Sequence, residues 1–225
     1  MLGLLAVPAA VGLSYLFCYG GFEGPIDWAM GTTTHGSRDH RRIALTFDDG
    51  PDPEHTPRVL DVLAALELKA TFFLVGSKVD AHPDLVARIV REGHELGNHT
   101  YHHRYLPLTR SRTVADELAR TDAAIMRVTG AVPRFARPPY GGRSTRNVRA
   151  FAAAGKQLVL WDVNSFDWKG KPPEEVADRV LSRVRPGSII LMHDVCPHTP
   201  EALRSIVRGL LARDYAAGTV SDVLA

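Results

Sequence analysis

Two adjacent carboxylates, Asp48 and Asp49, follow a short apolar run and precede Gly50 and Pro51. Two negative charges side by side repel each other unless a positive group lies between or beside them. One carboxylate can therefore bind a metal ion while the other acts as a base. An ordinary acidic turn has the same composition, so this pair indicates a site only in combination with other motifs.

A histidine cluster at residues 99–103 supplies candidate metal ligands. His99 and His103 are four residues apart, a spacing that predicts both imidazoles on one face of a helical turn, where they can share a metal ion. Pairing His102 with Asn98 gives a poorer set of ligands. We therefore expect His102 to be exposed or to support a ligand rather than to bind the metal.

Three further polar motifs follow predicted strands. In residues 137–141, Arg137 can hold a carboxylate in a bidentate pair, and the two prolines after it can direct a backbone N–H toward an oxyanion. In Asp167-Trp168, the tryptophan suits the apolar face of a sugar or a methyl pocket, although it also suits a core. In residues 191–194, the histidine is a candidate general acid whose partner is Asp194 or Asp167.

The segments around these motifs alternate between strands and helices. Short apolar runs predict strands over 43–47, 70–75, 157–163 and 188–192, and periodic apolar residues predict helices over 56–66, 83–92, 114–128, 173–184 and 200–213. The first helix is expected to have Thr56 as its N-cap and Pro57 at its first position. This alternation predicts a parallel sheet, either open or closed into a barrel, with the motifs at the carboxyl ends of the strands, where α/β proteins build their sites.

The five motifs occur in this chain order: TFDDGP, HTYHH, RPPYG, DW and LMHD. Together they resemble the five motifs of the polysaccharide deacetylases, the NodB-type domain of carbohydrate esterase family 4. Five motifs in this order, from Thr46 to Asp194, are hard to obtain by chance. The resemblance extends from about Ile43 to the end of the chain, where residues 214–224 are similar to the family's closing strand and helix. It implies a distorted (β/α) barrel with a parallel strand core.

The activity that the resemblance implies is metal-dependent hydrolysis of N-acetyl groups on glycans that contain N-acetylglucosamine, such as chitin oligomers or peptidoglycan, with release of acetate. The implied metal ligands are Asp49, His99 and His103, which would hold one divalent ion. Two imidazoles and one carboxylate favour zinc, although cobalt or nickel would also fit such a set.

The resemblance also implies the remaining roles. Asp48 would be the general base, held by Arg137, and His193 would be the general acid, tuned by Asp167. Many family members have an aspartate where Asn164 stands, a difference that affects fine tuning rather than the basic mechanism. The implied substrate-binding residues are Tyr140, through its backbone N–H, and Trp168 and Leu191, which would line the acetyl pocket.

Length and composition agree with one globular domain. The chain has 225 residues, of which 45% are hydrophobic and 23% charged, so it can bury a real core. A net charge of +2 gives no whole-chain argument for nucleic-acid binding. Arg143, Arg146 and Arg149 recur every three residues, which predicts the solvated face of a helix, with a dedicated anion site as the alternative. The expected partner is an N-acetylated glycan, and no protein partner is predicted.

The N-terminal segment, residues 1–22, carries no charge and is largely apolar. We expect it to be a membrane anchor or a signal peptide, with a buried core helix as the third alternative. Residues 23–42 show no periodicity and are expected to form a linker to the catalytic domain, residues 43–225. The domain would then lie outside the cytoplasm, membrane-anchored or secreted. A disulfide between Cys18 and Cys196 is not expected.

Other functions stay open at this stage. The same mechanism would serve an O-acetyl esterase acting on xylan, or a deformylase or deacetylase of a lipid-linked sugar. A non-catalytic glycan-binding domain is disfavoured because every presumed acid, base and ligand is present. A metal-stabilised structural protein normally uses four protein ligands, and three are found. Substrate choice is expected to depend on the loops 109–112, 169–172 and 195–199.

Overall fold

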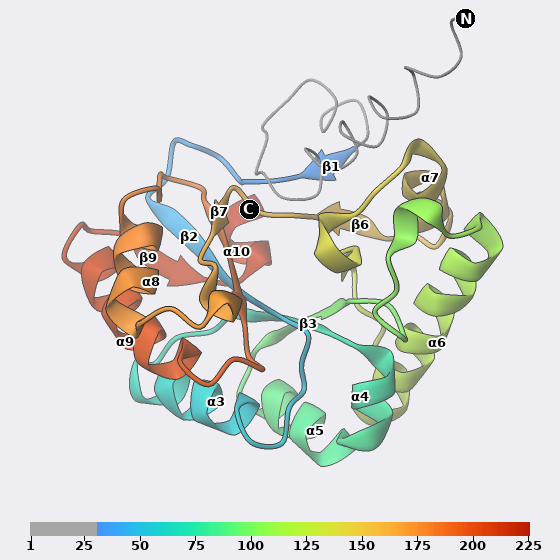
Figure 1. The fold of residues 1–225 in the computed structure, drawn as a ribbon, viewed down its shortest axis with the longest axis horizontal. Helices are drawn as coiled ribbons and strands as arrows, with labels where there is room; N and C mark the ends of the chain where they lie inside the picture. Colours follow the sequence, from blue (N-terminus) through green and yellow to red (C-terminus); the bar gives the residue numbers. More distant parts are fainter. Residues whose placement is uncertain (1–30) are drawn as a thin grey trace, which may run out of the picture.

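The computed structural model describes residues 31–225, whose helices and strands carry the labels of Figure 1. The apolar segment 1–22, the start of the expected linker and Cys18 lie outside the described residues, so the anchor or signal peptide stays a prediction. Within residues 31–225, every helix is too short or too polar to span a bilayer.

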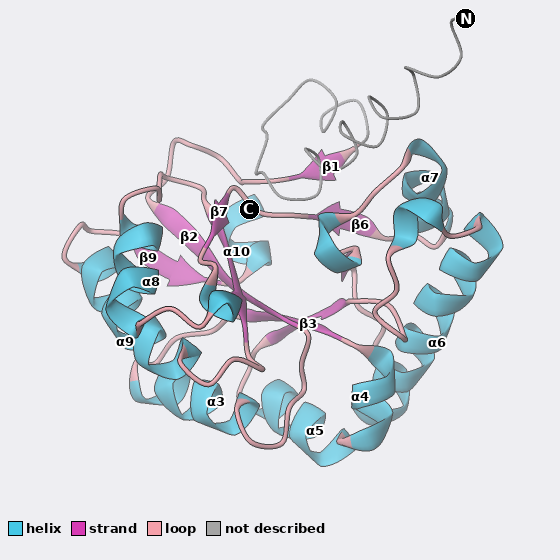
Figure 2. Ribbon diagram, viewed as in Figure 1, coloured by secondary structure: helices cyan, strands magenta, loops and turns pink. Residues whose placement is uncertain are grey.

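Nine parallel strands form one curved sheet with helices packed around its outside (Figure 2). The strands are β1 Thr32–Thr33, β2 Arg42–Asp48, β3 Thr71–Leu74, β4 Glu95–Asn98, β5 Phe135–Ala136, β6 Gln157–Val159, β7 Val163–Asn164, β8 Ile189–His193 and β9 Ala216–Gly218. Their order is β1-β6-β5-β4-β3-β2-β8-β7, and β9 pairs with the start of β2. This is the distorted (β/α) barrel that the family resemblance implied.

Most of the helices lie on the outer face of the sheet, with α8 and α9 at the left of Figure 1 and α6 and α7 at the right, whereas Val220 and Val223 of α10 pack with side chains of the inner face. The helices are α3 Thr56–Ala65, α4 Gly76–Ala81, α5 Pro83–Arg91, α6 Ser111–Thr129, α7 Thr145–Ala153, α8 Pro173–Leu181, α9 Thr199–Leu211 and α10 Val220–Leu224. Three short 3₁₀ turns complete the set: η1 Leu106–Leu108, η2 Pro139–Gly141 and η3 Asp167–Lys169.

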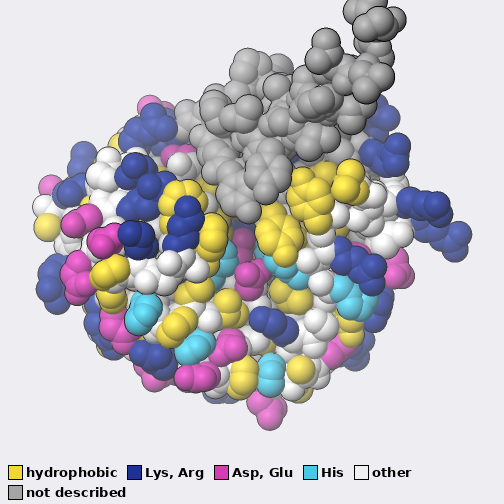
Figure 3. Space-filling model, viewed as in Figure 1, with side chains coloured by type: hydrophobic (Ala, Val, Ile, Leu, Met, Phe, Trp, Pro, Cys, Tyr) yellow, Lys and Arg dark blue, Asp and Glu magenta, His cyan; other side chains and the backbone are white. Residues whose placement is uncertain are grey.

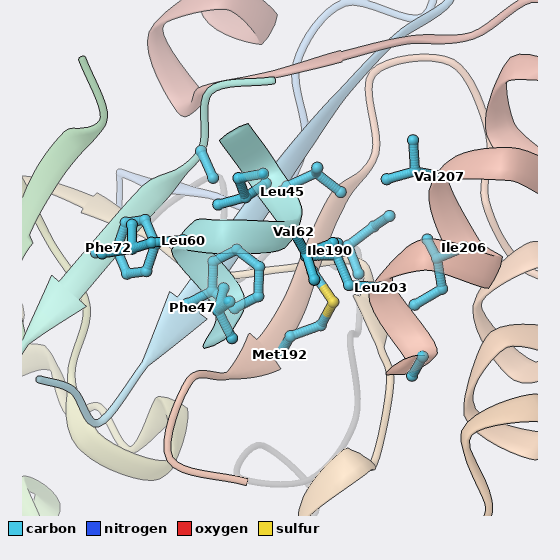
Figure 4. Close-up of a cluster of buried hydrophobic side chains, with 14 of the residues drawn as sticks. Leu45, Phe47, Leu60, Val62, Phe72, Ile190, Met192, Leu203, Ile206 and Val207 are labelled. Atoms are coloured by element: carbon cyan, nitrogen blue, oxygen red, sulfur yellow. The ribbon is translucent and has the colours of Figure 1, made fainter. Parts of the chain in front are cut away.

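The central strand β2 separates the two hydrophobic layers because its successive side chains point to opposite faces. Ile43, Leu45 and Phe47 pack outward into the main core. Figure 4 shows Leu45 and Phe47 beside side chains of α3, β8 and α9. The alternate residue Ala44 belongs to a second buried cluster inside the barrel. A strand covered on both faces reads as a continuous apolar run, which is why the run before Asp48 was recognisable.

Most predicted helices and strands are confirmed within a few residues, and two details are corrected. The N-cap of α3 is His55 rather than Thr56, whose hydroxyl instead donates to Asp194 and accepts from the Asp52 N–H. The single strand predicted over 157–163 is two strands, β6 and β7, with different neighbours in the sheet.

The described part of the expected linker belongs to the fold. Thr32 and Thr33 of β1 pair with β6, and His35 forms an isolated bridge with Ser188. Arg38 donates to Asp162 at 3.1 Å. The segment lacks a hydrophobic period because a two-residue strand depends on its neighbour β6 rather than on a local pattern, so the sequence alone did not reveal it.

Candidate active site

The polar motifs converge because their strands are parallel and end at the same edge of the sheet. Asp48 at the end of β2 is in register with His193 at the end of β8. His99 follows β4 directly, and Arg137 follows β5. In Figure 3, acidic and histidine side chains gather near the centre of the face shown, between hydrophobic ones.

A cavity of about 270 Å³ opens at this edge. Its walls combine carboxylates and imidazoles with aromatic and aliphatic side chains. The lining residues are Asp48, Asp49, His99, His103, Tyr140, Trp161, Asn164, Trp168, Leu191, His193, Val195 and Cys196. Eight of the ten residues singled out from the sequence therefore line one cavity, and the other two, Arg137 and Asp167, lie buried beside it.

Asp49, His99 and His103 form a compact ligand set. Asp49 Oδ1 lies 3.3 Å from His99 Nε2 and 2.9 Å from His103 Nε2, and one ligand atom from each residue lies within 4.8 Å of the others. The His99 Nδ1 lies 2.8 Å from the Arg137 carbonyl oxygen, which can only accept a hydrogen bond. The proton is therefore assigned to Nδ1, and Nε2 keeps its lone pair toward Asp49.

The electrostatics of this cluster suit a cation. Burial raises the pKa of Asp49, but the imidazoles of His103 and His99 outweigh burial and hold that pKa well below its usual range. Burial lowers the pKa of His99, yet Asp48 and Asp49 outweigh it and raise that pKa. Two carboxylates thus create a negative potential at two histidine nitrogens, which a divalent ion would neutralise. The donor set fits such an ion.

The backbone that presents the two histidines is a loop, which corrects the helical turn expected from their spacing. Thr100 and His103 both have positive φ, of 65° and 54°, whereas helical residues have negative φ. The Asn98 side chain stabilises the bend by accepting a hydrogen bond from the Thr100 N–H at 2.9 Å. The two imidazoles converge through this irregular loop, with ring centroids 5.0 Å apart.

Glu117 on α6 holds the same loop, and the sequence analysis did not single it out. Its buried carboxylate accepts hydrogen bonds from the backbone N–H groups of Tyr101 and His102, at 3.0 and 2.7 Å. It also lies 2.7 Å from His102 Nδ1, so His102 supports the loop, as expected, and is absent from the cavity wall. A carboxylate on the apolar face between Val114 and Leu118 was the available signal.

Asp48 is fixed by Arg137, whose side chain is fully buried inside the barrel. Arg137 Nη1 donates to Asp48 Oδ1 at 2.7 Å and to Thr46 Oγ1 at 2.8 Å. Its other two nitrogens donate to the carbonyl oxygens of Val159 and Leu160. The expected bidentate pair is therefore a single contact to the carboxylate, because backbone carbonyls occupy the rest of the guanidinium.

The guanidinium also packs on an aromatic ring, since its central carbon lies 4.0 Å from the centroid of Phe73. Gly97 on the neighbouring strand makes this possible, because a Cβ there would lie 2.2 Å from the Phe73 ring. Arg137 is thus a structural member of the barrel interior as well as the partner of Asp48.

Replacing Arg137 by methionine should lower the free energy of unfolding by about 3–5 kcal/mol, because it leaves the buried Asp48 carboxylate without its cation. Urea unfolding of the purified protein measures this loss. Arg88→Met is the matched control, since Arg88 forms partly exposed ion pairs and its loss should cost about 1 kcal/mol or less. Equal losses in the two variants would contradict the structural role of Arg137.

His193, also in the cavity wall, pairs with Asp167. His193 Nδ1 lies 2.8 Å from Asp167 Oδ1, and the backbone N–H of His193 donates to Oδ2 at 2.7 Å. Burial raises the pKa of Asp167, but His193 and the Thr199 hydroxyl outweigh burial and lower it. Of the two partners considered for His193, the structure selects Asp167.

Asp194, the alternative partner, is turned away and fully buried. It accepts from the Thr56 hydroxyl and lies against the Asp49-Gly50 turn, where a Cβ on Gly50 would be 2.1 Å from its Oδ2. Burial raises the pKa of Asp194 to about 7. The glycine after the two aspartates is therefore required by close packing.

The predicted substrate-binding residues frame the cavity mouth. Tyr140 has a left-handed backbone, with φ of 60°, in the turn after the two prolines, and its ring is T-shaped against His103 at 4.7 Å between centroids. Trp168 is 46% exposed, whereas Leu191 is buried in the wall. Val195 and Cys196, from a loop assigned to substrate choice, complete the lining.

Lys78, which had no sequence signal, donates to the Asp49 carbonyl at 2.8 Å.

A parallel (β/α) barrel with a carboxylate–histidine cavity at its carboxyl edge defines the class of this protein. The family model described as polysaccharide deacetylase matches residues 35–159, more than half of the chain. The chain belongs to the polysaccharide deacetylase family.

The curated relatives are deacetylases of two glycans. The peptidoglycan-N-acetylglucosamine deacetylase of Bacillus cereus is 39% identical over 158 residues, which are 70% of this chain and 58% of that protein. The chitooligosaccharide deacetylase of Sinorhizobium fredii is 44% identical over 156 residues, 69% of this chain and 73% of that protein. The chain spans only 40% of a Listeria monocytogenes peptidoglycan-N-acetylglucosamine deacetylase, at 36% identity over 83% of this chain.

Solved structures share the fold. A peptidoglycan N-acetylglucosamine deacetylase in complex with 4-naphthalen-1-yl-N-oxidanyl-benzamide matches with a TM-score of 0.86 at 33% identity, covering 89% of this chain and 97% of that one. A carbohydrate esterase family 4 pseudoenzyme from Bacillus anthracis matches with a TM-score of 0.82 at 30% identity, covering 85% and 68%. The fold therefore occurs both in active deacetylases and in a pseudoenzyme, so an inference of activity for this chain must rest on its site residues.

Proposed function

We propose that this protein is a metal-dependent hydrolase that removes N-acetyl groups from an N-acetylglucosamine-containing glycan, peptidoglycan or chitin oligomers, and releases acetate. One observation carries the proposal. A single cavity is lined by a carboxylate held by a buried arginine and by a histidine held by a buried carboxylate. A base and an acid in one cavity suit amide hydrolysis.

The proposed mechanism assigns one proton transfer to Asp48 and one to His193. Asp48, oriented by Arg137, accepts a proton from the water that attacks the acetamide carbon. His193, protonated and oriented by Asp167, donates a proton to the departing sugar nitrogen. The Tyr140 backbone N–H donates to the oxyanion that forms on attack, and Trp168 and Leu191 contact the acetyl methyl.

The metal is part of the proposal, with Asp49, His99 and His103 as its ligands and zinc as the ion that suits them best. When bound, a divalent ion polarises the acetamide carbonyl and lowers the pKa of the attacking water. Asp49 Oδ1 and His103 Nε2 support this assignment, since both are buried polar atoms without a well-formed hydrogen bond among the described residues.

His99→Ala and His103→Ala should each abolish tight metal binding, whereas His102→Ala should weaken it only slightly. Glu117→Ala should weaken it about 10–100-fold, because the loop that carries both ligands loses its anchor. Competition with a chromogenic chelator measures each metal affinity. An empty site in His102→Ala alone would show that the ligands are assigned wrongly.

Acetate release from a panel of N-acetylated chitin oligomers, peptidoglycan and acetylated xylan tests the activity. Release from the first two, lost on chelation and restored by zinc or cobalt, is the expected result. Release from xylan alone would favour the O-acetyl esterase. Glycan binding without any release, in metal-loaded protein, would favour the non-catalytic alternative that the pseudoenzyme relative illustrates.

A further inference from the structure

A second hollow lies between α6 and α7, away from the active-site cavity, with a volume of about 730 Å³. Ser111, Arg112 and Ala115 line it from α6, and Arg146, Arg149, Ala150, Ala153 and Ala154 line it from α7 and its end. We call this hollow the arginine groove. Lys and Arg side chains project from the edge of the molecule over these two helices in Figure 3.

The arginine groove carries uncompensated positive charge. Its wall includes three arginines and, among the described residues, no acidic side chain. Arg112, Arg146 and Arg149 are all exposed, and none forms a salt bridge within residues 31–225. Helix α6 begins at Ser111, and the side chain of its N-cap residue, Arg110, makes no capping hydrogen bond. The helix N-terminus therefore adds partial positive charge at Ser111. The small alanines leave the guanidinium groups accessible, so the groove suits a ligand with several separate anionic groups.

A row of aromatic rings extends from the active-site cavity to Tyr105, which shortly precedes Ser111 of the groove in the chain. The His103 ring contacts Tyr140, and the Tyr140 ring lies 6.2 Å from that of Tyr105, both tyrosines being partly exposed. Tyr105 precedes η1 and the start of α6, and the Asn147 side chain of α7 donates to the Leu106 carbonyl. A glycan leaving the cavity across the two tyrosines would approach the start of α6, where Ser111 and Arg112 line the groove, since aromatic rings suit the apolar faces of sugars.

We propose that the arginine groove binds the peptide carboxylates of a peptidoglycan strand whose acetamide occupies the active-site cavity. This inference rests on the proposed function and narrows its substrate class. A chitin oligomer is neutral and offers the groove no charge, whereas each peptide-bearing sugar of peptidoglycan offers carboxylates. The groove thus discriminates between the two glycans named by the relatives, and the cavity itself treats their acetamides alike.

The test compares three soluble probes of equal sugar length: peptidoglycan fragments with free carboxylates, the same fragments after amidation, and a chitin oligomer. The variant combines Arg112→Gln, Arg146→Gln and Arg149→Gln, which keep helix propensity and remove charge. The matched control combines Arg91→Gln, Arg204→Gln and Arg208→Gln, three exposed arginines on α5 and α9. Thermal melting verifies that both variants fold as the wild type does.

The groove variant should raise KM for the acidic fragments about tenfold, with kcat unchanged, because three exposed ionic contacts are lost and each is individually weak. Its KM for the amidated fragments and the chitin oligomer should equal that of the wild type, and the control variant should change none of the three. Equal effects on acidic and amidated fragments, or no effect on either, would overturn the proposal.

A failure of the proposed function can be distinguished from a failure of the groove proposal. If no probe releases acetate, calorimetric titration of the same proteins with the same probes still measures the affinity difference between acidic and amidated fragments. Tighter binding of the acidic fragments by wild type but not by the groove variant would support the groove without the activity. If the wild-type protein bound acidic and amidated fragments with equal affinity, the proposed role of the arginine groove would be refuted.

Discussion

Asp49→Asn should lose the metal ion, whereas Asp48→Asn should keep the ion and lose turnover. The two carboxylates are adjacent in the chain but differ in environment. Asp49 lies beside both ligand histidines, so a neutral amide there removes a ligand and the charge that offsets the cation. We expect metal affinity to fall by at least about 100-fold, more than outer-shell changes cost.

Asp48, by contrast, points into the barrel and bonds Arg137, and its Oδ2 is 3.7 Å from His99 Nε2. An asparagine can still accept the Arg137 hydrogen bond, so the fold and the His-His-Asp set should survive. Loss of the general base should lower kcat by about 10²–10⁴-fold. Measuring both metal content and acetate release for the two variants tests this assignment of roles. Equal metal loss in the two, or metal loss in Asp48→Asn only, would refute this division of roles.

The convergence of the motifs was predictable from the sequence because it follows from strand direction. Short buried strands end at Asp48 and His193, and parallel pairing places both ends at one edge. That rule needs no knowledge of loop shape. The strands before His99 and Arg137, β4 and β5, were too short to predict from their own pattern, so only the motifs themselves indicated that these two residues belong to the site.

The geometry around each motif was not predictable. The spacing of His99 and His103 suggested a helical turn, but an irregular loop brings them together, held by Asn98 and by Glu117 from a helix later in the chain. Arg137 bonds Asp48 once because two carbonyl oxygens of the β6 region take its remaining donors. Backbone acceptors carry no sequence signal, so such contacts appear only in three dimensions.

The acid of the proposed mechanism should reveal itself in the pH profile. Burial lowers the pKa of His193, but Asp167 foremost, with Asp48 and Asp49, outweighs burial and raises it to about 9. A general acid must be protonated, so activity should persist above neutral pH and fall as pH rises through the pKa of His193. A bound cation offsets the charges of Asp48 and Asp49, which leaves Asp167 as the group that sustains the raised pKa.

Asp167→Asn should therefore move the basic limb of the kcat profile to lower pH by about one to three units, because removal of a negative charge in contact with the imidazolium favours the neutral ring. It should also lower kcat at neutral pH, since less of His193 is protonated and Nδ1 loses its acceptor. Asp178→Asn, an exposed carboxylate on α8, is the control and should leave the limb in place. The measurement is acetate release against pH at saturating substrate and metal, with circular dichroism to verify the fold at each pH. An unchanged basic limb in Asp167→Asn would show that His193 does not supply the proton, and a limb that moved upward would reverse the electrostatic role assigned to Asp167.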